Sequence, residues 1–164
     1  MSVHTVPAAN PAHAAVAAAM SRLRRGSLAA LVLVVAEYGI GIYVNLYVTV
    51  PAADHGRSLS TALSNGPALL SVHVVVGLLL GLAGLGVLVQ SVMARHWIVL
   101  AVSVAALLAL AFASVAGTGF VRTGDTSASM AMSVLTGIAL LCYAVNLYLL
   151  GPAAGAGSQP DKAA

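Results

Sequence analysis

Four polar side chains interrupt the apolar segments of this sequence and are the residues best placed to do chemistry. Glu37, Tyr43 and Asn45 lie in the first apolar segment, and His73 lies near the start of the second. A charged carboxylate in the middle of a bilayer costs about 2.5 kcal/mol or more, so Glu37 is expected to face other helices, to be protonated or to be paired. We therefore take these four residues as a candidate ligand or proton site. Hydrogen bonds that only hold helices together are the alternative interpretation.

Helical spacing places several of these residues on two stripes that could face each other. Residues four apart lie on one face of a helix. The first stripe is Glu37, Gly41, Asn45 and Thr49, and the second is His73, Gly77, Gly81 and Gly84. Small residues at this spacing let another helix, or a flat cofactor, approach the backbone closely. We expect the stripes to face each other in the outer half of the bundle, with His73 bonded to Asn45, Glu37 or a carbonyl.

The second stripe also has the pattern of a haem-binding helix. A His followed by Gly on the same face occurs in helices that hold b-type haem, where the imidazole ligates iron. The apolar segments contain no further His. A second ligand would have to be His55, Met130, Met132 or the His73 of a second copy. Haem b is therefore a candidate cofactor, and close helix packing is the simpler interpretation.

No catalytic residue can be assigned from the sequence. A Ser-His-Asp arrangement, a phosphate-binding loop, a dinucleotide fingerprint and metal-ligand spacing are all missing. Cys142 is the only cysteine, which excludes an intrachain disulfide and a cysteine zinc site. The loops are too short to hold a catalytic domain, so a non-enzymatic role is favoured, and an enzyme acting inside the membrane stays open.

The composition explains why polar residues are so few. The chain has 164 residues, of which 60% are apolar and 7% are charged, and its mean hydropathy is +1.01. Soluble domains have about 25% charged residues, so the outer surface of this protein is expected to face lipid and not water. Seven Lys and Arg stand against four acids, but they form no stripe between aromatic residues, which argues against nucleic-acid binding.

The apolar segments predict an all-α protein, a transmembrane four-helix bundle. The helices are expected at about residues 27–50, 67–92, 97–116 and 127–150. At about 1.5 Å per residue, each can cross a hydrocarbon layer about 30 Å thick. Residues 27–150 would then be the transmembrane domain, residues 1–26 a mobile N-terminal tail and residues 151–164 a disordered C-terminal tail. Gly117 and Gly119 are expected in the loop between the last two helices.

The distribution of basic residues predicts the orientation. Five Lys and Arg flank the N-terminus, the turn at Arg95 and the C-terminus, whereas the other two loops carry Arg57 and Arg122. Basic residues favour the cytoplasmic side, so both termini are expected inside. Six of the seven basic residues are Arg, and Ala, Val, Leu and Gly dominate the composition. This bias is typical of a GC-rich bacterial genome, which predicts the cytoplasmic (inner) membrane of a bacterium. A cleaved signal peptide is the rival interpretation of the first segment, but that segment is long and contains Glu37.

The segment from Gly39 to Pro51, GIGIYVNLYVTVP, precedes His55-Gly56, and His73 follows in the next helix. This arrangement resembles a family of small uncharacterised integral membrane proteins of bacteria and archaea that have four transmembrane helices. Their pattern is Gly-x3-Asn-Leu-Tyr-Val-x2-Pro with a His early in the second helix, and here the Gly is Gly41 and the Asn is Asn45. The resemblance implies the four-helix topology and no particular activity.

Three functional hypotheses follow. The first is a non-enzymatic accessory or assembly module of a membrane complex, which would pack against a partner membrane protein or a second copy in the lipid bilayer. The second is an electron carrier that uses His73 with b-type haem or a quinone. The third is a small proton-coupled carrier that uses Glu37.

Overall fold

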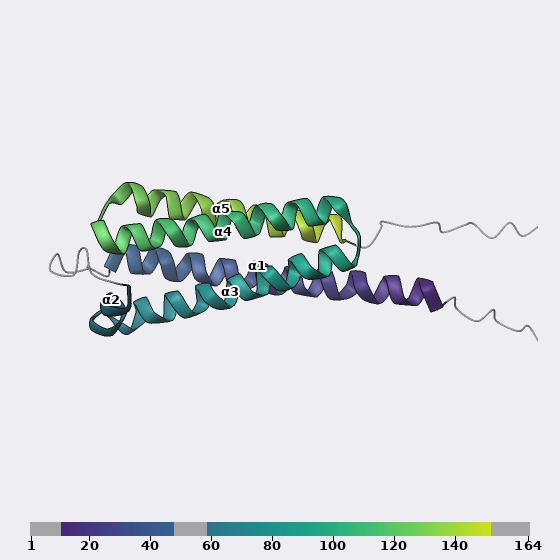
Figure 1. Ribbon diagram of the computed structural model, residues 1–164, viewed down its shortest axis with the longest axis horizontal. Helices are drawn as coiled ribbons and strands as arrows, with labels where there is room; N and C mark the ends of the chain where they lie inside the picture. The colour runs from purple at the N-terminus through teal and green to yellow at the C-terminus, as the bar shows by residue number, and fades with distance from the viewer. Residues whose placement is uncertain (1–10, 48–58, 152–164) are drawn as a thin grey trace, which may run out of the picture.

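The computed structural model describes residues 11–47 and 59–151, and it is helical throughout (Figure 1). Its helices are α1 (Pro11–Tyr47), α2 (Leu59–Asn65), α3 (Ala68–Met93), α4 (Trp97–Thr123) and α5 (Thr126–Leu149). All but α2 are long and apolar enough to cross a membrane. The prediction of an all-α bundle of four such helices is confirmed, and the chain is a multi-pass membrane protein by the length and composition of these helices.

The four long helices form a closed ring of neighbours. Helix α1 packs against α3 and α5, and α4 packs against α3 and α5. The start of α1, the α3–α4 turn and the end of α5 lie toward one end of the bundle, and α2 and the α4–α5 turn lie at the other (Figure 1). We call the first end the arginine end, because it carries the exposed residues Arg22, Arg24, Arg25 and Arg95. The start of α1 and the end of α5 lie at the same end of the bundle, as an even number of membrane crossings requires. The side of the membrane on which this end lies stays a prediction.

Each long helix buries one stripe of mostly small or β-branched side chains. The buried positions on α1 include Leu23, Ser27, Ala30, Val34, Glu37 and Val44, and those on α5 include Ser129, Thr136, Ala139, Tyr143 and Asn146. The spacing of three to four residues is that of one helix face. Large apolar side chains such as Leu85, Phe112 and Leu141 point outward instead. At many positions, polar side chains therefore face the interior of the bundle and apolar side chains face its outer surface, as is expected for a protein surrounded by lipid.

The two tight turns have specific end signals. Arg95 adopts a left-handed conformation (φ 53°) between α3 and α4, and the His96 side chain accepts a bond from an N–H in the first turn of α4. Gly124 (φ 68°) ends α4 in the left-handed conformation that glycine adopts without strain. Asp125 then caps α5 by accepting the backbone N–H of Ser127 at 2.9 Å. These signals fix where the helices reverse direction.

The structure differs from the expected helix bounds in three places. Helix α1 begins at Pro11, so residues 11–26, expected in a tail in which residues 14–25 could form a short interfacial helix, are helical and continuous with the first span. Their many Ala and Arg are strong helix formers, and Pro is accepted at a first helical position. Helix α4 continues to Thr123, which places Gly117 and Gly119 inside the helix and corrects their assignment to a loop. The short α2 was not expected. Expectations for residues 1–10, 48–58 and 152–164 lie outside the described residues.

Candidate functional site

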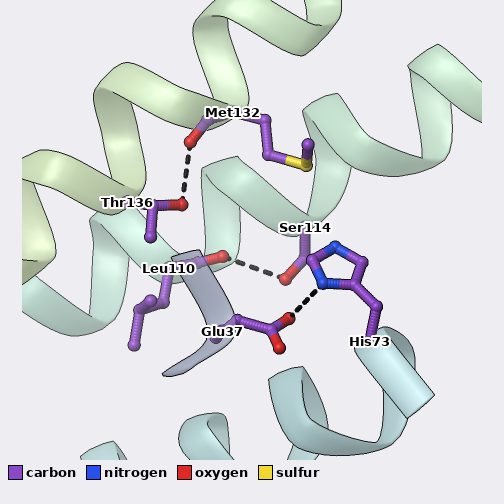
Figure 2. Close-up of polar contacts among 6 residues, drawn as sticks. All are labelled: Glu37, His73, Leu110, Ser114, Met132 and Thr136. Carbon is purple, nitrogen blue, oxygen red and sulfur yellow. Dashed lines mark hydrogen bonds and ion pairs between the residues drawn. The ribbon is translucent and has the colours of Figure 1, made fainter. Parts of the chain in front are cut away.

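Glu37 of α1 and His73 of α3 form a buried pair. The His73 Nδ1 atom lies 3.0 Å from the Glu37 Oε1 atom, and the two side chains are 18% and 11% exposed (Figure 2). A Cβ atom at Gly77 would lie 2.9 Å from Glu37 Oε1, and one at Gly41 would lie 3.2 Å from His73 Cε1. Each glycine therefore lets the opposite side chain rest on its helix. The expectation that these two stripes face each other is confirmed at these four residues.

The pair leaves hydrogen-bonding capacity unused. The Nδ1···Oε1 distance is that of an ion pair, but the ring nitrogen lacks the alignment of a hydrogen bond. Glu37 Oε2 is buried and has no partner among the described residues. Buried polar atoms normally have a hydrogen-bond partner, and exceptions often mark functional sites or bound water. The Glu37 carboxyl group can therefore accept or share a further hydrogen bond.

The pair lines a cavity of about 490 Å³ between the helices. Its walls come from all four long helices and are mainly apolar, and its polar lining includes Tyr38, Asn45, Ser114, Ser133 and Thr136. This volume falls within the range of about 300–1,000 Å³ that is usual for ligand sites, which typically combine apolar walls with a few polar groups. The arrangement can hold an apolar molecule and orient it by one polar end.

Two hydroxyl groups of this cavity are committed as donors to their own helices. Ser114 Oγ donates to the carbonyl oxygen of Leu110 at 2.9 Å, and Thr136 Oγ1 donates to that of Met132 at 2.8 Å (Figure 2). A hydroxyl has one hydrogen, so these two oxygens face their surroundings only as acceptors. A donor for the polar end of a bound molecule must therefore come from another residue of the lining, such as His73.

The other two predicted site residues take different places. Asn45 lines the cavity, but its Oδ1 atom accepts a bond from Ser129 Oγ of α5 at 2.8 Å instead of contacting His73. Tyr43 is 52% exposed, pairs its ring with Tyr47 at a centroid distance of 4.7 Å and does not line the cavity. Its expected bond within the bundle is not formed among the described residues, because its position on α1 faces outward.

Of the residues considered as second haem ligands, only Met132 lines the cavity with His73. Met130 is 71% exposed and lies on the outer face of α5. His55 is outside the described residues, as is Thr49. Within the parts of the chain that the structure describes, no group of three or more His, Cys, Asp or Glu side chains could hold a metal ion.

A second buried polar group lies nearer the arginine end, outside the predicted site residues. Asn146 Nδ2 of α5 donates to Ser103 Oγ of α4 at 3.0 Å, and Ser103 Oγ lies 3.2 Å from Ser91 Oγ of α3. Thr136 at the cavity and Ser129, which bonds Asn45, were not among the predicted site residues either. The signal that could have found them is their place on the buried face of α5, which Asn146 shares.

No family model matches the sequence, and no curated protein or solved structure is similar to it. The resemblance to small four-helix membrane proteins therefore stays a prediction.

Proposed function

We propose that this small integral membrane protein is a non-enzymatic module that binds a lipophilic carbonyl compound of the quinone class inside its bundle. The observation that carries the proposal is the Glu37–His73 pair, 3.0 Å apart, on the wall of an apolar cavity of about 490 Å³. Charged residues within transmembrane helices are rare, and they usually face the bundle interior and mark functional sites. This proposal develops the quinone part of the second sequence hypothesis.

The charge balance of the pair indicates what the bound molecule must offer. A single proton shared by the two groups gives either carboxylate with imidazolium or carboxylic acid with neutral imidazole, and both forms are uncharged overall. In both forms Nε2 of His73 carries a hydrogen, because Nδ1 faces Glu37. A net charge in the bilayer would be costly, so the uncharged forms are favoured. The pair then presents an N–H donor, which a carbonyl oxygen accepts.

The remainder of the cavity favours a flat or elongated apolar body. Gly81 lines the cavity, and a Cβ atom there would meet no atom within 4 Å of those described. The neighbouring walls include Leu78 and Leu107, and Ser114 and Thr136 offer acceptor oxygens. A quinone ring with its apolar tail matches this combination of an N–H donor and an extensive apolar wall.

Equilibrium binding of a short-chain benzoquinone to the purified protein in lipid nanodiscs tests this proposal. Empty nanodiscs measure partition into lipid. We expect saturable binding above that background, lost in His73→Phe and weakened in Glu37→Gln, which keeps the shape but removes the shared proton. The matched control is Tyr43→Phe, because Tyr43 lies outside the cavity. Binding equal to that of empty nanodiscs, or unchanged in His73→Phe, would end the proposal.

Haem b is the second candidate, and Met132 is the observation that favours it. His73 and Met132 line one cavity from α3 and α5, and His with Met is a known axial pair for haem iron. Ligation would need a lone pair on Nε2, so the proton would reside on Nδ1 beside the Glu37 carboxylate. A carboxylate behind a metal-ligating His is a common supporting contact. Haem binding would thus release the Nε2 proton, whereas carbonyl binding would retain it.

An absorption spectrum separates the two candidates. After expression with ample haem, the haem hypothesis predicts a Soret band that His73→Ala abolishes and Met132→Leu changes. A preparation without a Soret band would exclude haem and leave the quinone proposal unaffected.

The two other roles stay predictions. An accessory or assembly role is compatible with ligand binding. A proton-coupled carrier would use the same Glu37, and vesicle uptake that is independent of pH, or unchanged in Glu37→Gln, would argue against it.

A further inference from the structure

A layer of buried polar side chains crosses the bundle toward the arginine end. Ser91, Ser103 and Asn146 come from α3, α4 and α5, and their exposed fractions are 0%, 1% and 0%. Ser27 of α1 is also fully buried. It lies at the same level, because a Cβ atom at its neighbour Gly26 would lie 3.5 Å from the Gln90 amide, one residue before Ser91. All four long helices therefore place a polar group in this layer.

The hydroxyl groups of the layer can be satisfied among the described residues. Ser91 Oγ lies 2.8 Å from the carbonyl oxygen of Val87 and Ser103 Oγ lies 2.7 Å from that of Val99, so each can donate within its own helix. The two hydroxyl oxygens are 3.2 Å apart, and either hydroxyl can instead donate to the other. Because Asn146 Nδ2 donates to Ser103 Oγ, a chain of donors can run from Asn146 through Ser103 to Ser91.

The Asn146 amide is the part of the layer that lacks a partner. Its Oδ1 atom is buried and has no hydrogen-bond partner in the described part of the chain, and the same holds for Ser27 Oγ. Turning the amide over only exchanges the unpaired atom, because Nδ2 would then take the place of Oδ1. The layer therefore suits an outside group that can donate to an amide oxygen and can also accept a hydrogen bond.

We propose that this polar layer is a binding site for internal water. A water molecule carries two hydrogens, which suit Ser91 Oγ and Asn146 Oδ1, and it can accept from Ser27 Oγ or the second Asn146 Nδ2 hydrogen. Buried waters of this kind typically make about three hydrogen bonds to otherwise unpaired polar groups. The site is separate from the cavity, which none of these four residues lines.

The charges around the layer favour water over a cation. The acids in the described residues are Glu37, which is paired with His73, and Asp125, which caps α5 at the other end of the bundle. The exposed residues Arg22, Arg25 and Arg95 surround the near end and repel cations. A cation in the layer would lack a compensating negative charge, which is costly away from water.

The test is an experimental structure of the wild-type protein at a resolution that shows ordered water. We expect density within hydrogen-bond distance, about 2.7–3.2 Å, of Asn146 Oδ1 and Ser91 Oγ. The same density should be missing in Asn146→Leu and present in Ser114→Ala, whose hydroxyl is bonded only within α4. If Asn146→Leu does not fold, Ser91→Ala removes one partner of the water and should lower its occupancy.

A second measurement distinguishes water from a cation. Thermal unfolding of the wild-type protein should give the same midpoint in sodium, potassium and choline chloride at equal ionic strength. A midpoint that rises with one alkali cation would overturn the proposal, as would an experimental structure in which the layer contains no ordered water. Either result is independent of quinone or haem binding.

Discussion

Toward the arginine end, Ser91, Ser103 and Asn146 lie in a closed core, whereas Glu37 and His73 line a cavity nearer the other end. The closed layer has only neutral side chains, and the cavity contains the two ionisable ones. In a membrane, hydroxyl and amide groups can bridge helices at modest cost, but an ionisable pair needs a compensating environment. The comparison supports the proposal that the cavity, and not the closed layer, holds a ligand.

Gly81 and Gly84 belong to the same stripe of small residues on α3, but they have different roles. A Cβ atom at Gly84 would lie 2.6 Å from Tyr143 Oη, so this glycine allows close packing. A Cβ atom at Gly81, by contrast, would meet no atom within 4 Å beyond its chain neighbours and the backbone of its own helix. The missing side chain therefore contributes space to the cavity. A stripe of small residues therefore predicts either close helix approach or an opening, and the sequence does not distinguish them.

The largest effect on stability is expected from Gly84→Ala. Tyr143 is fully buried, so its ring has little room to move away from a new methyl group, and we expect a loss of about 1–3 kcal/mol in the free energy of unfolding. Gly81→Ala should be neutral or stabilising by up to about 1 kcal/mol, because Ala favours a helix. Reversible unfolding in mixed detergent micelles measures both.

Tyr143→Phe is the control for this contrast. It removes the Oη atom, which has no partner among the described residues, and should restore most of the stability lost in Gly84→Ala. Equal losses in Gly84→Ala and Gly81→Ala would contradict the distinction between a closed and an open region.

The second prediction fills the cavity. Gly81→Leu should occupy space in the cavity without displacing a neighbour, and it should weaken quinone binding by at least about tenfold, or about 1.4 kcal/mol. Gly86→Leu is the matched control on the same helix, since Gly86 also has free space around it but does not line the cavity. Nanodisc binding measures the affinity. Loss of affinity in both variants would show a general change in α3 instead of a filled site.

These contrasts also show what the sequence could predict. Apolar length was sufficient for four long helices, because each must span the hydrocarbon layer. Spacing placed Glu37 and His73 on two stripes that were expected to face each other, and Glu37, which His73 contacts, was one of three expected partners. The helix ends were less predictable: α1 extends back to Pro11 through residues that favour a helix without being apolar enough to mark a span.

Contacts that involve α5 could not be predicted in this way. Periodicity identifies a buried face but not the helix opposite to it. Asn45 therefore bonds Ser129 where His73 was one expected partner, and Asn146 bonds Ser103 of α4. The cavity depends on how the four helices diverge, and no single segment encodes that property.

The third prediction concerns the closed layer. Ser103→Ala removes the acceptor of Asn146 Nδ2, and we expect a loss of about 0.6 kcal/mol, and at most about 1.7, the range found for hydrogen bonds between transmembrane helices. Ser114→Ala removes an exposed hydroxyl bonded to its own helix and should change stability by less than about 0.5 kcal/mol. Detergent unfolding again gives both values. A larger loss in Ser114→Ala would contradict the idea that the closed layer, and not the cavity wall, holds the helices together.

The smallest effect is expected at Asp125, whose exposed carboxylate caps α5. The backbone N–H and the hydroxyl of Ser127 hydrogen-bond to this carboxylate and lower its pKa from the ordinary value of 3.8. A lowered pKa in the folded state means that the stabilisation is complete above about pH 4 and is lost as the pH falls through the lowered pKa. Asp125→Asn keeps an acceptor for the cap but has no charge to titrate.

The stability difference between wild type and Asp125→Asn should therefore be small and in favour of the wild type near neutral pH. It should shrink toward zero in acid, as the wild-type carboxyl group takes up its proton. Unfolding of both proteins at several pH values measures the difference, in which the pH effects that both proteins share cancel. A difference that grows in acid would contradict the lowered pKa.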